Sequence, residues 1–414
     1  MALELHINGS LLEGARYVGW APSPCVLRAV EGPSLPASLT IGNRSSATGG
    51  KLLFYAEPTA VPSESLELTP APMTRSVRFW VGGKFGSPST ADGDTAITVS
   101  DGAQTLLETP VMVRVRKDAN SLTPTERDRF LAALSRLNDR GAGVFQVFRE
   151  MHVGRATEEA HGRTGFLPWH RAYLLDLERE LQLLDPSVAL PYWRFDVAAA
   201  RLFHPAFLGG STPQGLVRLA PGNPLRFWVT DGVPGIHRVP EFDTAVGPAQ
   251  DADSSGPIPT ELETLSLGQD QGSSYLPFWE NLEMSPHGYA HVSFGGSISS
   301  IGTAARDPLF FLLHANVDRL WAKWQWLFHR FDATQPESYS PGGRIGHELD
   351  DNMWPWNGVT GGVRPPTAPG GELAASLTAT APAPRPRVRD MFDYQGRFQA
   401  EARLGFDYDD VPFD

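Results

Sequence analysis

The chain has 414 residues, of which 41% are hydrophobic, and this is enough to bury a core in each of two domains or in one large domain. Its formal net charge of −12, without clustered lysine and arginine, excludes nucleic acid and an anionic membrane as partners. The single cysteine, Cys25, excludes an internal disulfide and a thiolate metal cage.

The N-terminal residues, MALELHINGS, lack the basic start and apolar block of a secretory signal. The sequence has no run of about eighteen apolar residues that could span a bilayer. We therefore expect a cytoplasmic protein with no membrane segment.

Residues 1–115 carry apolar residues in short alternating runs, such as SVRFWVGG and TAITVS, separated by Gly, Pro, Ser and Asp. This spacing predicts an N-terminal all-β, sandwich-like domain over 1–115. Its role is left open between covering the functional site, mediating self-association and stabilising the rest of the chain.

A helical pattern begins after Leu122, where SLTPTERDRFLAALSRLND combines a Ser or Thr cap with apolar residues three and four apart. Further helices are predicted over 144–152, 169–184 and 308–329. In the last of these, Asp307 is the expected N-cap and Pro308 the first helical residue. The stretches 241–275 and 332–385 are poor in regular pattern, and we interpret them as long surface loops.

Six of the eleven histidines fall into two sets of three on this frame: His152, His161 and His170, then His287, His291 and His314. A spacing of four between His287 and His291 puts both imidazoles on one face of a helix, within reach of one metal ion. A single such pair is commonly an accidental surface feature, and a single core histidine is commonly hydrogen-bonded to backbone. Two sets of three instead indicate two metal sites.

The type of metal follows from what these motifs lack. HGYAH has Gly288 where an HExxH metalloprotease carries its general-base Glu, and no paired Glu-x-x-His motif of a di-iron bundle is present. Sites made only of imidazole suit copper, zinc, iron and nickel, and two such sites together favour a pair of copper ions.

Three segments, FLPWHRAYLLDLE, PHGYAHVSFGG and DPLFFLLHANVDRLWAKWQ, closely resemble the copper-binding motifs of the type-3 copper family of tyrosinases, catechol oxidases and haemocyanins. The resemblance covers roughly 125–330. It implies that 116–414 form a mainly α catalytic domain, an antiparallel helical bundle with long loops that holds two copper ions. The first copper would be bound by His152, His161 and His170, and the second by His287, His291 and His314.

The resemblance also implies the reaction: copper-dependent oxidation of o-diphenols to o-quinones with O2, with monophenol oxidation left open. The alternatives are an o-aminophenol oxidase and a haemocyanin-like oxygen carrier. The partners are then O2 and a phenolic or catecholic small molecule. The sequence leaves open the exact phenol, the oligomeric state and the need for a copper-delivery partner.

Four further residues take roles from the resemblance. Glu283 would be catalytic, ordering a water near the second copper and helping to deprotonate a phenol, the alternative being a solvated carboxylate at a helix end. Gly288 stands where many hydroxylating members have Asn. Val292 and Ile301 would line the substrate pocket, with Ile301 in place of a bulky Phe of some plant members, and plain packing is the alternative for both.

Many plant and fungal members join a ligand histidine to a cysteine by a thioether. Because Cys25 lies in the β-rich segment, we expect His161 to be unmodified. For the other five histidines we expect only surface or core packing: His6, His204, His237, His329 and His347.

Overall fold

The computed structural model describes residues 2–32, 34–102, 104–153, 156–212, 214–250, 256–267, 273–357 and 372–413. The chain divides into two compact units: Met1–Arg116 with Ser376–Ala381 and Tyr394–Asp414, and Lys117–Ala375 with Pro382–Asp393. This grouping differs from the expected division at 115/116 because two C-terminal segments belong with the first unit. There the Arg116 N–H donates to the Asp407 carbonyl (2.7 Å), and Trp20 Nε1 donates to the Tyr408 carbonyl (2.8 Å).

The first unit contains two sheets whose strands pair mostly antiparallel. One has the order β1-β3-β7-β5 and the other β2-β9-β8-β4-β6, where only β2 and β9 pair in parallel. Buried and partly exposed residues alternate along β1 and β3, as expected for strands with one face on a core. The strands are β1 (Leu3–Ile7), β2 (Tyr17–Val18), β3 (Ser23–Ala29), β4 (Leu39–Ser45), β5 (Leu52–Tyr55), β6 (Leu66–Leu68), β7 (Ser76–Gly83), β8 (Thr95–Ser100) and β9 (Thr105–Val113).

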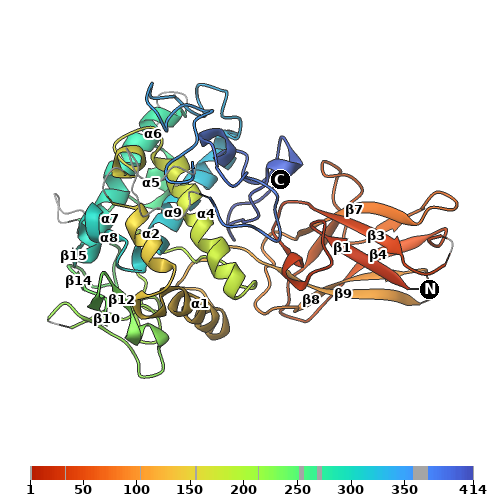
Figure 1. Ribbon diagram of the computed structural model, residues 1–414, viewed down its shortest axis with the longest axis horizontal. Coiled ribbons are helices and arrows are strands. Elements are labelled where there is room, and N and C mark those ends of the chain that lie inside the picture. The colour runs from red at the N-terminus through yellow and green to blue at the C-terminus, as the bar shows by residue number, and fades with distance from the viewer. Residues whose placement is uncertain are drawn as a thin grey trace. The chain divides into compact units, whose positions relative to one another are not determined.

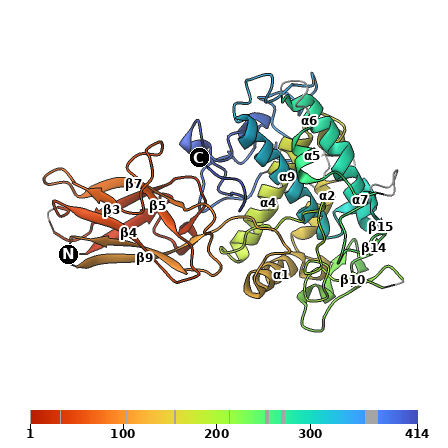
Figure 2. The same ribbon diagram turned by 180° about the vertical axis from the view of Figure 1, so that it is seen from behind.

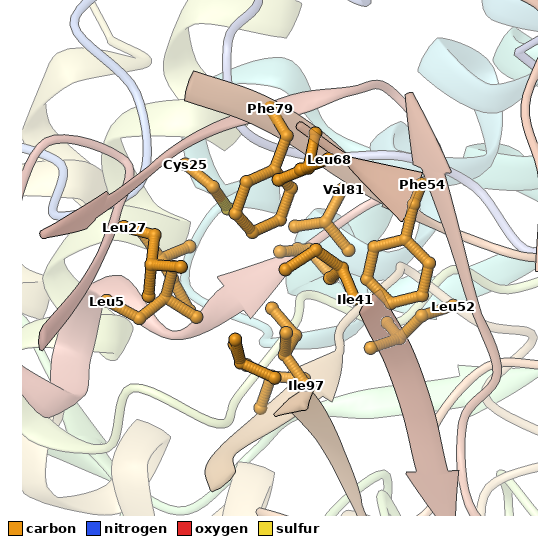
Figure 3. Close-up of a cluster of buried hydrophobic side chains, with 14 of the residues drawn as sticks. Leu5, Cys25, Leu27, Ile41, Leu52, Phe54, Leu68, Phe79, Val81 and Ile97 are labelled. Carbon is orange, nitrogen blue, oxygen red and sulfur yellow. The ribbon is translucent and has the colours of Figure 1, made fainter. Parts of the chain in front are cut away.

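Side chains from both sheets share one hydrophobic cluster. Figure 3 shows Leu27 and Phe79 of one sheet pointing into the same interior as Ile41 and Ile97 of the other. Cys25 lies in this cluster with 1% of its surface exposed, and burial raises the pKa of its thiol. The thiol is therefore protonated and packs as a small apolar side chain.

The second unit contains the helices. In both Figure 1 and Figure 2, α4 and α9 lie side by side with α2 next to them. Both long helices are buried along most of their length, so they form the interior of this unit. The helices are α1 (Pro124–Asn138), α2 (Phe145–Met151), α3 (Ala156–Ala160), α4 (Phe166–Leu184), α5 (Glu261–Leu265), α6 (Tyr275–Leu282), α7 (Tyr289–Val292), α8 (Ile301–Ala304) and α9 (Leu309–Phe328).

Local sequence explains where two of these helices begin. Thr123 and Glu126 form a reciprocal capping box at the start of α1. At α9 the expected cap is displaced by one residue, since the helix begins at Leu309 with Pro308 at the N-cap position. The Asp307 carboxylate nevertheless accepts from the Leu309 N–H (2.9 Å) and pairs with the buried Arg238 (2.7 Å).

Short two-stranded ribbons connect the helices. β10 (Gly210–Ser211) pairs with β11 (Val217–Arg218), and β12 (Val229–Thr230) pairs with β13 (Val233–Pro234). The third ribbon joins distant parts of the sequence, β14 (Arg238–Pro240) and β15 (Phe294–Gly296). Within the described residues, no helix combines the length and the apolar character that crossing a membrane requires.

The described part of 332–385 contains no helix or strand, as expected for a loop, but parts of it are buried and not on the surface. Trp354 and Trp356 are each 1% exposed, although they lie outside any helix or strand. Their partners are on α4: Trp169 Nε1 donates to the Trp354 carbonyl (2.5 Å), and Trp356 Nε1 donates to Asp176 (2.7 Å). The other segment interpreted as a loop, 241–275, contains the short helix α5.

Candidate metal centre

The structure brings the six predicted histidines together as two triads. In each triad, the nitrogen atoms that could bind a metal all lie within 4.8 Å of one another. The first triad is His152, at the end of α2, His161, in the loop between α3 and α4, and His170, on α4. The second triad is His287, in a π-helical turn, His291, on α7, and His314, on α9.

Backbone carbonyls fix the orientation of four of these rings through Nδ1. His170 donates to Phe166 O (2.9 Å) and His287 to Glu283 O (2.8 Å), each four residues earlier in the chain. The carbonyls for the other two come from the segment after α7, Ile301 O for the distant His152 (3.3 Å) and Ile298 O for His291, seven residues earlier (2.8 Å). Since a carbonyl only accepts, Nδ1 carries the proton and Nε2 keeps its lone pair.

His161 is oriented by a carboxylate, because its Nδ1 lies 3.3 Å from Glu283 Oε1. His314 is the exception among the six, and its buried Nδ1 has no hydrogen-bond partner in the described part of the chain. Five of the six imidazoles are thus held with Nε2 turned inward. An acceptor on the outer nitrogen of the ring is the usual arrangement around a metal-binding histidine.

The inward nitrogens have the spacing that a shared metal requires. His314 Nε2 lies 3.3 Å from His287 Nε2 and 3.2 Å from His291 Nε2. Two imidazoles on one ion, with bonds of about 2.0–2.1 Å and near-tetrahedral angles, place their nitrogens about 3.3 Å apart. In the first triad, His152 and His161 approach to 2.9 Å, and His170 Nε2 is buried with no hydrogen-bond partner among the described residues. The residues therefore fit a metal ion in each triad.

Burial keeps five of the six imidazoles neutral, namely His152, His170, His287, His291 and His314. Desolvation, assisted by the neighbouring histidines, lowers the pKa of His152, His170, His287 and His314 well below the ordinary value. It lowers the pKa of His291 to about 4. A neutral imidazole is the form that binds a metal, so near neutral pH these five histidines need no deprotonation to accept one.

The two triads adjoin. The rings of His170 and His314, one from each triad, are stacked with centroids 4.1 Å apart and planes inclined by 7°. The rings of His161 and His287 lie 6.3 Å apart. Two ions bound at these triads would share one buried chamber, walled by the aromatic rings of Phe166 and Phe310.

Glu283 contacts both triads. Its carbonyl accepts from His287, while its carboxylate Oε1 accepts from the backbone N–H of Gly162 (2.7 Å) and lies against His161. Its Oε2 accepts from Trp279 Nε1 (2.9 Å). The side chain is only 11% exposed, so it is not the solvated helix-end carboxylate that was the alternative.

A cavity of about 520 Å³ lies over the histidines. All four other predicted site residues line it, because Glu283, Gly288, Val292 and Ile301 are among its wall residues, together with four of the histidines. Val292 and Ile301 are 40% and 50% exposed, so the cavity is reached from the surface. Ile301 has a second role that its sequence position did not reveal, since its carbonyl orients His152.

His347, for which only packing was expected, supports the loop that carries His161. Its imidazole is 1% exposed, and its Nδ1 accepts from the Gly165 N–H (3.0 Å), one residue before α4. The Tyr339 hydroxyl donates to the His347 carbonyl (2.7 Å), and the Tyr275 hydroxyl donates to Thr164 O (2.5 Å). Because the segment around His347 was interpreted as a surface loop, the sequence did not predict that His347 supports the loop of His161.

Sequence comparisons with known proteins agree with the centre. A family model described as the common central domain of tyrosinase matches residues 142–327, which include all six histidines. A tyrosinase from Streptomyces antibioticus is 34% identical over 268 residues, 59% of this chain and 94% of that protein. A grixazone synthase from Streptomyces griseus is 31% identical, over 52% of this chain and 85% of that protein. Among solved structures, a functional unit of octopus hemocyanin aligns with a TM-score of 0.45 and 22% identity, over 73% of this chain and 69% of its own.

Proposed function

This chain belongs to the tyrosinase family, and from that premise we propose that it oxidises o-diphenols to o-quinones with O2 at a pair of copper ions. The observation that carries the proposal is the pair of adjoining, buried imidazole triads beneath a cavity open to the surface. A pair of copper ions held there would supply electrons to O2, two at once, with one from each Cu(I). Each o-diphenol loses two electrons and two protons, so two o-diphenols reduce one O2 to two molecules of water.

The cavity favours an enzyme over an oxygen carrier. An oxygen carrier needs space only for O2, whereas about 520 Å³ lies within the range of about 300–1,000 Å³ that holds drug-sized ligands. Its wall includes His161, His287 and His291, so a phenol in the cavity would lie against ligands from both triads. That placement supports direct oxidation of the bound phenol.

We propose two roles for Glu283: it positions His161, and it accepts a phenolic proton through one bound water. A carboxylate has about four acceptor sites. Three donors already occupy Glu283, namely His161 Nδ1, Gly162 N–H and Trp279 Nε1. One acceptor site on Oε2 is left, which supports one water and no more.

Gly288 leaves that water with one partner fewer than an Asn would provide, which favours diphenols over monophenols. The position has room for a side chain, since a Cβ on Gly288 would meet only Glu283 O, at 3.4 Å. Its φ of −56° and ψ of −44° are ordinary for any residue. Gly288→Asn is therefore a fair test of the missing partner.

The experiment loads the purified protein with copper and compares oxidation of catechol, phenol and 2-aminophenol by O2 uptake. Turnover of catechol supports the proposal, turnover of 2-aminophenol alone identifies an o-aminophenol oxidase, and reversible O2 uptake with no turnover identifies a carrier. We expect Glu283→Gln to slow phenol oxidation more than catechol oxidation, because a catechol has the lower pKa and needs less help from a base. Gly288→Asn should raise the phenol-to-catechol ratio.

Glu280→Gln is the matched control, since Glu280 is exposed on the neighbouring α6. It should leave both rates and their ratio unchanged. An unchanged ratio in Glu283→Gln and in Gly288→Asn would refute the proposed handling of the phenolic proton.

We further propose the architecture that this function implies: an all-β, sandwich-like domain over 1–115 and a mainly helical dicopper domain over 116–414, built as an antiparallel bundle, apart from Ser376–Ala381 and Tyr394–Asp414, which group with the first unit. The alternating burial along β1 and β3 supports the first part. The position of His170 on α4 and of His314 on α9 supports the second.

A further inference from the structure

The cavity over the histidines has an apolar outer wall. Three of its wall residues are large, apolar and exposed to solvent: Met284 at 73%, Ile301 at 50% and Val292 at 40%. Met284 follows Glu283 directly, and Val292 ends α7, one residue after the ligand His291. These three side chains, the apolar rim, would surround the part of a bound phenol that points away from the histidines.

The described wall of the cavity carries no lysine or arginine. Its single carboxylate is Glu283, whose oxygens already accept three hydrogen bonds. Arg163 adjoins the wall residue Gly162 in sequence but is not in the wall, and its charge acts on His347 instead. A carboxylate on the substrate would therefore lose water at the rim without gaining a cation, which is unfavourable.

The volume also bears on the substrate. About 520 Å³ is more than the ring of a simple phenol fills. If the ring lies against His161 and His287, the remaining space extends between Val292, Ile301 and Met284. An apolar substituent opposite the hydroxyl would be removed from water there, and each buried methylene makes the free energy of binding more favourable.

We infer that the preferred substrates are uncharged phenols or catechols with an apolar substituent para to a hydroxyl group, rather than amino-acid or carboxylate phenols such as L-tyrosine or L-DOPA. This inference rests on the proposed function and adds the substrate class to it. The apolar rim selects by the substituent, while the histidines and Glu283 act on the hydroxyl end.

The test compares three catechols that differ in the substituent alone: 4-propylcatechol, 3-(3,4-dihydroxyphenyl)propionate and L-DOPA. We expect kcat/KM for 4-propylcatechol to exceed both others at least about tenfold. Binding is measured separately by calorimetry on protein loaded with Zn²⁺, which binds to imidazole but does not turn over. The dissociation constants should follow the same order.

Val292→Arg supplies the missing cation at the rim. It should raise kcat/KM for the propionate relative to 4-propylcatechol about fivefold, as expected for a partly exposed ion pair. Val246→Arg is the matched control, because Val246 is 77% exposed and does not line the cavity. It makes the same change of side chain and charge, and it should leave the ratio unchanged.

The outcomes separate the two proposals. If the copper-loaded protein oxidises none of the three catechols, the proposed function fails. If it oxidises all three and the charged ones are equal to or better than 4-propylcatechol in both kcat/KM and binding, the function stands and the inference about the apolar rim is overturned. A shift in the ratio that is as large in Val246→Arg as in Val292→Arg also overturns it, because net charge would then be the cause.

Discussion

Gly165→Ala tests whether the His347 side chain holds the loop between His161 and α4. A Cβ on Gly165 would lie 2.6 Å from His347 Nδ1 and 2.9 Å from its Cε1, so the imidazole has to move by nearly 1 Å. His347 is 1% exposed, and the movement breaks the 3.0 Å bond from the Gly165 N–H. The backbone itself is not strained, since φ is −71° and ψ is −6° at Gly165.

The expected cost follows from these contacts. Losing a buried hydrogen bond costs about 1–3 kcal/mol, and forcing a methyl group into a packed interior costs about 1–3 kcal/mol. The reduced freedom of Ala in the unfolded chain offsets about 0.4–1 kcal/mol. We expect Gly165→Ala to lower the free energy of unfolding by about 2–4 kcal/mol, and to lower copper occupancy because the displaced loop carries His161.

The assay is urea unfolding of the copper-free protein, together with copper content after loading. Gly222→Ala is the matched control, because a Cβ there would meet nothing within 4 Å, and it should cost nothing. In a double-mutant cycle, Gly165→Ala should add little in a His347→Ala background, where the clash is gone. The reasoning is refuted if Gly165→Ala costs less than about 1 kcal/mol, or costs as much without the imidazole as with it.

Three further predictions address the ligands and the ion pair beneath them. His314→Ala or His170→Ala should each reduce copper content by about one ion per chain and abolish turnover, and full occupancy by metal analysis would contradict the ligand assignment. Acid should destabilise the copper-free protein: the folded pKa of His291 is lowered from 6.5 to about 4, so its contribution, about 3 kcal/mol, is present above pH 6.5 and lost as the pH falls to about 4. Urea midpoints that do not fall between pH 7 and pH 5 would contradict this. Asp318→Asn leaves the fully buried Arg171 without its 2.6 Å carboxylate partner and should cost about 3–5 kcal/mol, whereas a cost below about 1 kcal/mol would show that the pair contributes little.

The sequence predicted which histidines come together, because residues that could share a metal are constrained by residue type and local spacing. His287 and His291 are four apart, and both join His314 as expected. Which nitrogen faces the metal could not be predicted, because it is decided by acceptors that tertiary folding supplies. The carbonyls of Ile298 and Ile301 reach His291 and His152 only after the segment that follows α7 has folded back.

The support around the first triad was missed for a related reason. Periodicity identifies buried helices and strands, but residues 332–357 have no period and contain turn-forming Pro and Gly, so they resembled an exposed loop. Their aromatic residues were the usable signal. Tyr339, Trp354 and Trp356 are each 1% exposed, and the last two bury against α4, so the segment forms part of the core without regular secondary structure.

Glu283 shows how one residue couples the two halves of the centre. Its carbonyl holds His287 of the second triad, and its carboxylate holds the loop of His161 in the first. Glu283→Gln keeps the backbone carbonyl bond to His287 but offers one side-chain oxygen in place of two. With the amide oxygen at the position of Oε1, Trp279 Nε1 loses its acceptor; with the amide NH2 group there, His161 Nδ1 and Gly162 N–H lose theirs. The substitution therefore weakens the hydrogen bonds of the side chain and the site for a water, while His287 keeps its orientation. Loss of copper from the first triad alone in Glu283→Gln would therefore identify the positioning role of Glu283. A changed ratio of monophenol to diphenol oxidation at full copper occupancy would instead identify its role toward the phenolic proton.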